Sequence, residues 1–250
     1  MELLFLGASS AFSVEKNNYQ SNMLLLSKSG KKLLLDCGTD IRHSLHAQNL
    51  LSSDIDSVYI SHLHSDHSGG LEWLGFSSRF FEASKPNLFI SNDLKQMLWD
   101  NVLCGGMCSI ENEEATLMAF FNVKEIIDGS FSWEEYHFEL IKTTHYLSNA
   151  QVMPSYGLVI TNGIRKIFIT TDTRFSPSLM TNFKQYDLIF HDCETAIKSS
   201  GQHARFEELI TLAPEIKNKI WLYDYNDGDL PDAKAEGFLG FVIPGQRFKL

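Results

Sequence analysis

The sequence predicts a protein of the α/β (α+β) class in which two mixed β-sheets pack face to face and are flanked by helices, an αββα sandwich. Short strands come in two batches, one in each half of the 250-residue chain. Segments with helical spacing of apolar residues lie between these strands, an arrangement typical of sheets covered by helices. No internal repeat, low-complexity tract or Pro/Gly-rich linker interrupts the chain, so we expect one domain, residues 1–250.

The expected strands are short runs of apolar and β-branched residues bounded by Gly, Ser and Asn. In the first half they cover Glu2–Leu6, Asn22–Ser27, Lys32–Asp36 and Val58–Ile60. In the second half they cover Phe138–Ile141, Gly157–Thr161, Lys166–Thr170, Asp187–Phe190 and Ile220–Tyr223.

Two stretches have the spacing of amphipathic helices. After Asn92, which can cap a helix, apolar residues recur at i, i+3, i+4 and i+8, from Leu94 to Val102. Phe206, Leu209 and Ile210 form one apolar stripe after His203.

The composition narrows the classes of function. The net charge of -10 disfavours a partner such as a long nucleic acid, whose phosphates attract basic proteins, but suits a small anionic substrate held by metal ions. No stretch approaches the ~18 apolar residues of a membrane span, so we expect no membrane association of that kind. Four scattered cysteines do not make a disulfide framework, and we expect a cytoplasmic protein.

The stretch ISHLHSDHSGG, residues 60–70, contains the pattern H-x-H-x-D-H directly after an apolar run. In an extended segment His62 and His64 project to the same side, so both imidazoles can bind one metal ion. The chain must then turn to present Asp66 and His67 to a second ion, and the pair Gly69–Gly70 suits a tight loop. Imidazole and carboxylate ligands favour zinc, although manganese and iron(II) accept the same set.

This motif after a buried strand resembles that of the metallo-β-lactamase superfamily, which has an αββα fold with metals at the sheet edges. The resemblance covers the whole chain, because later ligand positions recur in order at His145 and Asp172. It implies two divalent ions that share the carboxylate of Asp172 and activate a hydroxide for attack. The implied ligands are His62, His64 and His145 for the first ion, and Asp66 and His67 for the second.

The sequence departs from the family pattern at the last ligand. The resemblance implies a histidine after the final strand, whereas KIWLYDYNDGD places Asp224 there. A carboxylate can also bind zinc or manganese, so Asp224 is the candidate, with Asp227 or Asp229 as alternatives if the loop has another register.

Asp192 and His203 resemble the acid–histidine pair of the ribonuclease Z-like phosphodiesterase branch. The resemblance implies that the histidine protonates the leaving oxygen and that the carboxylate orients it, as expulsion of an alkoxide requires. The predicted catalytic residues are Asp66 of the H-x-H-x-D-H motif together with His203 and Asp192. Beside them, His191 is expected to pack or to support the site.

Within this branch the chain looks most similar to the cyclic nucleotide phosphodiesterases of the anti-Pycsar group. It has NYQSN at 18–22, PSYG at 154–157 and PGQ at 244–246, and it lacks the Gly/Pro-rich arm that ribonuclease Z enzymes use on transfer RNA. The resemblance implies hydrolysis of 3′,5′-cyclic nucleotides to nucleoside monophosphates and a homodimer. Tyr156 and Phe175 are candidates to stack on the base, and plain packing is the alternative that we favour for both.

Two other functions stay open at this point. One is a transfer RNA-processing endoribonuclease similar to ribonuclease Z. The other is a nucleotide-binding protein with impaired catalysis, which the unusual Asp224 would explain.

Overall fold

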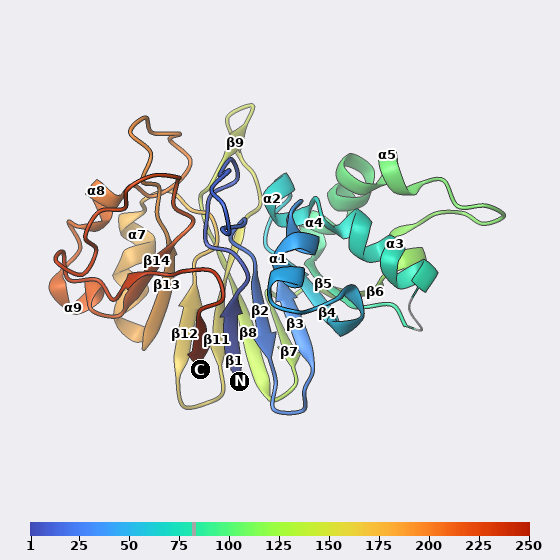
Figure 1. Cartoon of the computed structure of the whole chain (residues 1–250), viewed down its shortest axis with the longest axis horizontal. Coiled ribbons are helices and arrows are strands. Elements are labelled where there is room, and N and C mark those ends of the chain that lie inside the picture. The colour runs from blue at the N-terminus through green and yellow to red at the C-terminus, as the bar shows by residue number, and fades with distance from the viewer. Residues whose placement is uncertain (82–83) are drawn as a thin grey trace. The chain divides into compact units, whose positions relative to one another are not determined.

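A computed structural model describes residues 1–81 and 84–250 of the chain. The chain divides into two compact units. The first unit comprises residues 1–7, 19–128 and 244–249, and the second comprises residues 8–18, 129–243 and 250. Each unit contains one mixed β-sheet with its own helices beside it (Figure 1).

The sheet of the first unit has the strand order β16-β1-β2-β3-β4-β5-β6. Strands β16, β1, β2 and β3 pair antiparallel, whereas β3, β4, β5 and β6 pair parallel. The strand bounds are β1 Glu2–Phe5, β2 Met23–Leu26, β3 Lys32–Leu35, β4 Ser57–Ile60, β5 Asn87–Ser91, β6 Asn122–Ile126 and β16 Arg247–Lys249. The helix bounds are α1 Ile41–Ala47, η1 Ser52–Asp54, α2 Ser65–Ser68, α3 Leu71–Phe81, α4 Asn92–Met97, η2 Leu98–Leu103, α5 Cys104–Met107 and α6 Leu117–Phe120.

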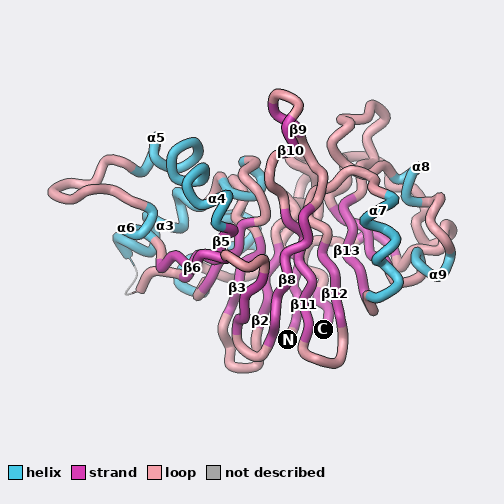
Figure 2. The backbone as a smooth tube through the Cα atoms, turned by 180° about the vertical axis from the view of Figure 1, so that it is seen from behind, coloured by secondary structure: helices cyan, strands magenta, loops and turns pink. Residues whose placement is uncertain are grey.

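The sheet of the second unit has the order β15-β14-β13-β12-β11-β8-β7, and Figure 2 shows its central strands side by side. Here β12 to β15 are parallel, and β12, β11, β8 and β7 are antiparallel. The strand bounds are β7 Ser130–Trp133, β8 Tyr136–Lys142, β11 Tyr156–Thr161, β12 Lys166–Ile169, β13 Leu188–Asp192, β14 Ile220–Tyr223 and β15 Gly240–Phe241. A separate ribbon joins β9 Leu147–Ser148 to β10 Gln151–Val152, and the helices are α7 Pro177–Met180, η3 Thr181–Gln185, α8 Phe206–Leu209 and α9 Pro214–Lys217.

Burial of apolar side chains attaches the helices of the second unit to its sheet. Phe183, Leu209 and Ile216 from the helical segments share one core cluster with Phe168 and Ile189 of the strands. The short helices α7, α8 and α9 are too brief to be stable alone, so this packing is what holds them. The parallel strands consequently end at a fixed edge, where the polar residues follow.

All nine expected strands are present, with bounds shifted by at most two residues. The helix expected after Asn92 is also present, but its N-cap is Ser91, and η2 continues it as a π-helix. Strands β5, β6, β7, β9, β10, β15 and β16 were not expected, and most of them are short or largely polar. Among the described residues, no helix is both long and apolar enough to cross a membrane.

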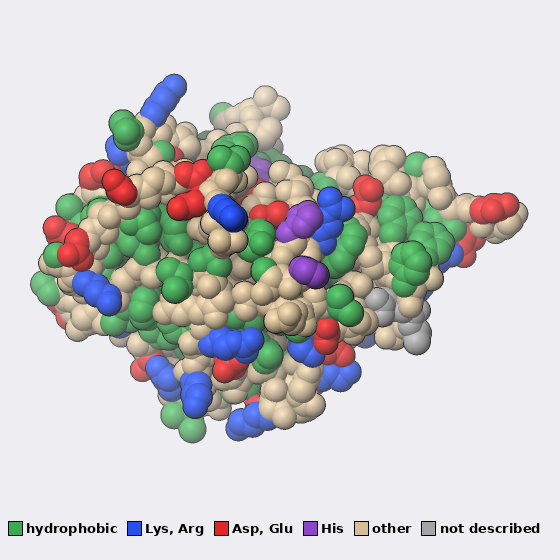
Figure 3. Space-filling view, viewed as in Figure 1, with side chains coloured by type: hydrophobic (Ala, Val, Ile, Leu, Met, Phe, Trp, Pro, Cys, Tyr) green, Lys and Arg blue, Asp and Glu red, His purple; other side chains and the backbone are tan. Residues whose placement is uncertain are grey.

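Hydrophobic side chains remain exposed at the end of α3. Phe80 is 61% exposed and Phe81 is 85% exposed. Figure 3 shows hydrophobic side chains gathered over this helix. Exposed apolar side chains that lie together can form a contact surface.

Candidate metal and catalytic site

The first group of candidate ligands lies between β4 and α3 of the first unit. The Nε2 atom of His62 is 3.1 Å from the Nδ1 atom of His64, as two side chains on one side of an extended segment should be. The expected tight loop is instead one turn of helix, α2, which carries Asp66 and His67. The ring of His67 lies 4.1 Å from that of His62, so the motif does form one local cluster.

Asp36 supports this cluster from the end of the neighbouring strand β3. One carboxylate oxygen accepts from the backbone N–H of Ser61 at 2.7 Å. The other accepts from the Ser61 hydroxyl at 2.7 Å and faces Nδ1 of His67 at 2.8 Å. Asp36 is buried and has a positive φ of 63°, a conformation that aspartate tolerates better than most residues. From the sequence, Asp36 is expected only as the last residue of a strand, although an acid at the end of a strand beside the motif was the available signal.

The contact between Asp36 and His67 determines which imidazole nitrogen can bind a cation. When the Nδ1–H group of His67 donates a hydrogen bond to the carboxylate, Nε2 carries the lone pair that can bind a metal ion, as in metal-binding histidines. Nε2 lies 3.1 Å from a carboxylate oxygen of Asp66. The donor chemistry of this group therefore fits a divalent cation.

Close backbone packing fixes the position of α2. A Cβ atom on Gly70 would collide with the backbone oxygen of Gly38 and the side chain of Ile41. Asn22 also joins the two segments, because its side chain donates to the carbonyl of Asp66 at 3.1 Å and accepts from the N–H of Gly38. Asn22 ends the NYQSN phrase, so its role in this unit is structural support.

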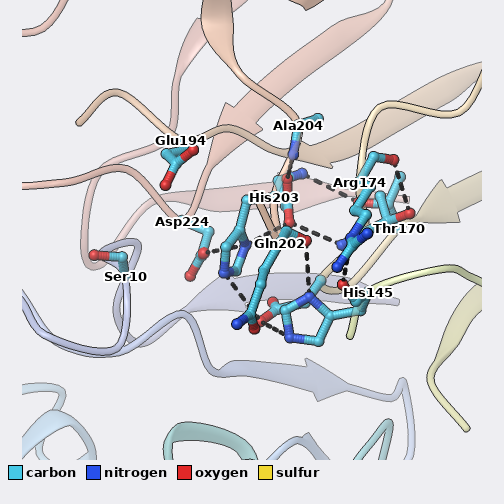
Figure 4. Close-up of polar contacts among 12 residues, drawn as sticks. Ser10, His145, Thr170, Arg174, Glu194, Gln202, His203, Ala204 and Asp224 are labelled. Carbon is cyan, nitrogen blue, oxygen red and sulfur yellow. Dashed lines mark hydrogen bonds and ion pairs between the residues drawn. The ribbon is translucent and has the colours of Figure 1, made fainter. Parts of the chain in front are cut away.

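The second group gathers at one edge of the sheet in the second unit. His145 follows β8, and its Nδ1 lies 3.0 Å from the backbone oxygen of Gln202 (Figure 4). Its Nε2 lies 3.4 Å from a carboxylate oxygen of Asp172, which follows β12. Burial lowers the pKa of His145, which favours the neutral ring that a metal ion needs.

His203 lies among three carboxylates. Its Nδ1 is 2.8 Å from Asp192 and 3.4 Å from Asp224, and its Nε2 is 4.0 Å from Asp172. Burial alone would lower the pKa of His203, but the carboxylates of Asp192, Asp172 and Asp224 outweigh it and raise the pKa to about 11. His203 is therefore a cation near pH 7 and carries a proton that it can donate.

Asp224 is a buried residue directly after β14, with a φ of 64°. Its N–H donates to the carbonyl of Ala8 at 2.8 Å, which holds this turn in place. The alternatives behave differently: Asp229 is exposed, and the carboxylate of Asp227 binds Ser13 and the N–H of Val14. Asp224 is thus the acid that joins the cluster, and each of four side chains offers one ligand atom within 4.8 Å of the others: Asp172, Asp192, His203 and Asp224.

Backbone geometry also directs Asp172. Thr171 has a φ of 50°, which is rare for a β-branched residue and is a mark of local strain at functional sites. Hydrogen bonds hold the segment in this conformation, because the hydroxyl of Thr143 donates to the carbonyl of Asp172 and the N–H of Thr173 donates to Asp192. The backbone that follows Asp172 is therefore bonded to the carboxylate of Asp192.

Three further candidates lie outside the second group. His191 is buried, and its ring packs against Phe183 with centroids 5.6 Å apart. Phe175 is partly buried against the hydrophobic core, so packing rather than base stacking accounts for it. Tyr156 is half-buried in β11.

Comparison with known proteins places these features in a family. The family described as "Anti-Pycsar protein Apyc1" matches residues 1–248. An anti-Pycsar protein Apyc1 from Paenibacillus harenae is 31% identical over 255 residues, covering 100% of both chains.

Solved structures show the same fold at low sequence identity. The metallo-β-lactamase fold protein YhfI from Bacillus subtilis has a TM-score of 0.75 and 18% identity, and the match covers 99% of each chain. The short form of human tRNase Z has a TM-score of 0.69 and 17% identity, over 100% of this chain and 99% of that one. The chain therefore has the metallo-β-lactamase fold, as the motif predicted.

Proposed function

The chain belongs to the anti-Pycsar Apyc1 family, and on that premise we propose that it hydrolyses 3′,5′-cyclic nucleotides to nucleoside monophosphates. The observation that carries this proposal is His203, a charged imidazole held by Asp192 beside the buried carboxylate of Asp172. A phosphate diester needs such a proton donor, because its alkoxide leaving group is a poor one.

We propose that the two groups of ligands act together, within one functional domain, on two divalent ions, with zinc as the first candidate and manganese or iron as alternatives. His62, His64 and His145 would hold one ion, Asp66 and His67 the other, and Asp172 would be shared. Asp224 would fill the last ligand position. The neutral ring of His145 and the Nδ1 contacts of His67 and His145 support this assignment. Two bound cations would supply Lewis acidity to the phosphate and lower the pKa of a bound water to about 7.

The roles of the chain's own residues follow from their contacts. The hydrolysis adds one water across a phosphorus–oxygen bond of the cyclic ester. As that bond breaks, Nε2 of His203 gives its proton to the departing ribose oxygen. Asp192 holds Nδ1 of the ring and keeps the imidazole charged before the transfer.

Turnover of purified protein tests the proposal. The protein is loaded with zinc or manganese and incubated with cyclic AMP, GMP, CMP and UMP, and the products are separated by chromatography. We expect a linear monophosphate from at least one nucleotide, and its loss in His145→Ala. The matched control is His137→Gln, which changes an exposed histidine on β8 of the same unit.

The same assay contains the outcomes that would replace this function. Cleavage of transfer RNA precursors without cyclic nucleotide turnover would identify an endoribonuclease. Tight nucleotide binding with one bound ion and no product would identify a binding protein, and Asp224 would then be the reason.

We also propose that the protein acts as a homodimer in the cytoplasm. The family resemblance supports the dimer, and the exposed Phe80 and Phe81 of α3 are suitable contact residues. Light scattering should give twice the chain mass of 28.4 kDa. A monomer at micromolar concentration would contradict the dimer without affecting the proposed reaction.

A further inference from the structure

A small hollow of about 70 Å³ lies beside His203 and Asp224 in the second unit. Its other walls are Glu194, Asn226 and the segment Ser10–Phe12. Figure 4 shows Ser10, Glu194 and Asp224 on one side of His203, away from His145 and Arg174. Sites that enclose a whole ligand usually measure ~300–1,000 Å³, so this hollow has room for one substituent of a larger molecule.

Glu194 is a firmly placed acceptor in this hollow. It is only 5% exposed, and its backbone bonds to Ala204 and Phe206 in the segment that carries His203. Its carboxylate accepts from the N–H of Ser200 at 2.7 Å and from the hydroxyl of Ser199 at 3.1 Å. A carboxylate has about four lone-pair sites, so it can accept a further hydrogen bond.

Ser10 supplies a group of the opposite kind. The side chain of Asn226 donates to the Ser10 hydroxyl oxygen at 3.1 Å. The amide oxygen of Asn226 is itself fixed by the N–H groups of Thr195 and Ala196. While its oxygen accepts from Asn226, the Ser10 hydroxyl still has its own proton to donate.

These walls select the chemistry of the substituent. The carboxylate of Glu194 accepts hydrogen bonds, so the hollow favours a neutral donor over a phosphate oxygen, which is itself only an acceptor. On the sugar of a nucleotide, a hydroxyl is the group that can both donate to Glu194 and accept from Ser10. A 3′,5′-cyclic nucleotide has one free hydroxyl on its sugar, at the 2′ carbon.

We propose that this hollow binds the ribose 2′-hydroxyl of the substrate, with Glu194 as acceptor and Ser10 as donor. The inference rests on the proposed function and makes the protein selective for ribonucleotides over deoxyribonucleotides. Selectivity follows because a substrate without the hydroxyl leaves the buried polar groups of the hollow without their partner.

The test compares kcat/KM for cyclic AMP and 2′-deoxy cyclic AMP. We expect the ribonucleotide to be preferred by about 10- to 100-fold, the range for a hydrogen bond to a charged group. Ser10→Ala and Glu194→Gln should reduce this preference and leave the value for the deoxynucleotide within about twofold. Glu207→Gln is the matched control, because Glu207 is an exposed acid on α8. The ratio of kcat/KM values for the two substrates in this variant should equal that of the parent protein.

The outcomes separate this inference from the proposed function. Equal values for the two substrates in the parent protein, or an unchanged ratio in Ser10→Ala, would overturn the hydroxyl pocket while the phosphodiesterase activity stands. If Glu194→Gln fails to fold, the substrate pair and Ser10→Ala still decide. Hydrolysis of neither nucleotide would overturn the proposed function, and this inference with it.

Discussion

The Nδ1 atom of His203 lies 2.8 Å from the carboxylate of Asp192, and the two residues are eleven positions apart in the sequence. Asp192 is fully buried at the end of β13, so its charge acts in a medium of low dielectric. Asp192 also accepts from the N–H groups of Thr173 and Ala204, which fix its orientation. The pair is therefore preorganised for proton transfer from the opposite nitrogen.

Replacing His203 should slow the reaction without weakening substrate binding. We expect His203→Gln to lower kcat by about 10²- to 10⁴-fold with little change in KM, the usual contribution of a general acid. The loss should be much smaller with bis(p-nitrophenyl) phosphate, whose leaving group needs no proton. Equal losses on both substrates would contradict the role of proton donor.

The charge of His203 should make stability depend on pH in metal-free protein. Its pKa is raised from 6.5 to about 11, so its stabilising contribution is complete below pH 6.5 and is lost as the pH rises toward 11. The difference in unfolding free energy between the parent protein and His203→Gln should shrink by up to about 1.4 kcal/mol per pH unit between pH 7 and pH 9. Urea denaturation in the presence of a chelator measures it. A difference that grows with pH would refute the assigned charge.

Removing the charge of Asp36 should weaken metal binding. Asp36→Asn lowers the basicity of His67, and we expect a loss of about 10- to 100-fold in zinc affinity, as for other carboxylate–histidine–metal contacts. Competition with a chromophoric chelator measures the affinity. Asp128→Asn, at an exposed position, is the control. An equal loss of zinc affinity in this variant would contradict the role of Asp36.

A change at Asp224 should reveal the last ligand. Asparagine tolerates the positive φ of 64° at this position, so Asp224→Asn removes charge with little backbone cost. Elemental assay should find about one divalent ion per chain, where the parent protein holds about two. Asp227→Asn should retain both ions, because the carboxylate of Asp227 binds Ser13 and Val14 instead. Two retained ions in Asp224→Asn would show that Asp224 is not a ligand.

Two glycine substitutions should act in opposite directions. Gly70→Ala places a methyl group against the backbone oxygens of Gly38 and Cys37, and we expect it to lower the unfolding free energy by more than about 1 kcal/mol. Gly105 lies in α5, and a Cβ atom added to it would meet open space, so Gly105→Ala should raise the unfolding free energy by about 0.5–1 kcal/mol. Thermal denaturation of both variants tests the packing around α2, and similar effects from both would contradict it.

The expected strands were found because they are continuous apolar runs, which local periodicity detects. Strand β6 was not predicted, because most of its side chains are exposed and polar. Its pairing with β5 is what makes it a strand. The loop expected around Asp66 became a helical turn for a similar reason. Its conformation depends on Gly38 and Asn22, which are distant in sequence.

The apolar runs of the sequence were sufficient to predict nine strands. The order of the histidines and acids carried the resemblance that predicted the fold family and implied the candidate ligands. Tertiary structure alone decided that Asp36 supports His67, that Asp224 rather than Asp227 approaches His203, and that Ser10 meets Asn226 across 216 positions. The division has a physical cause. The spacing of apolar residues can be read from neighbouring positions in the sequence. Burial, pKa values and hydrogen-bond partners depend instead on contacts that exist only after the chain has folded.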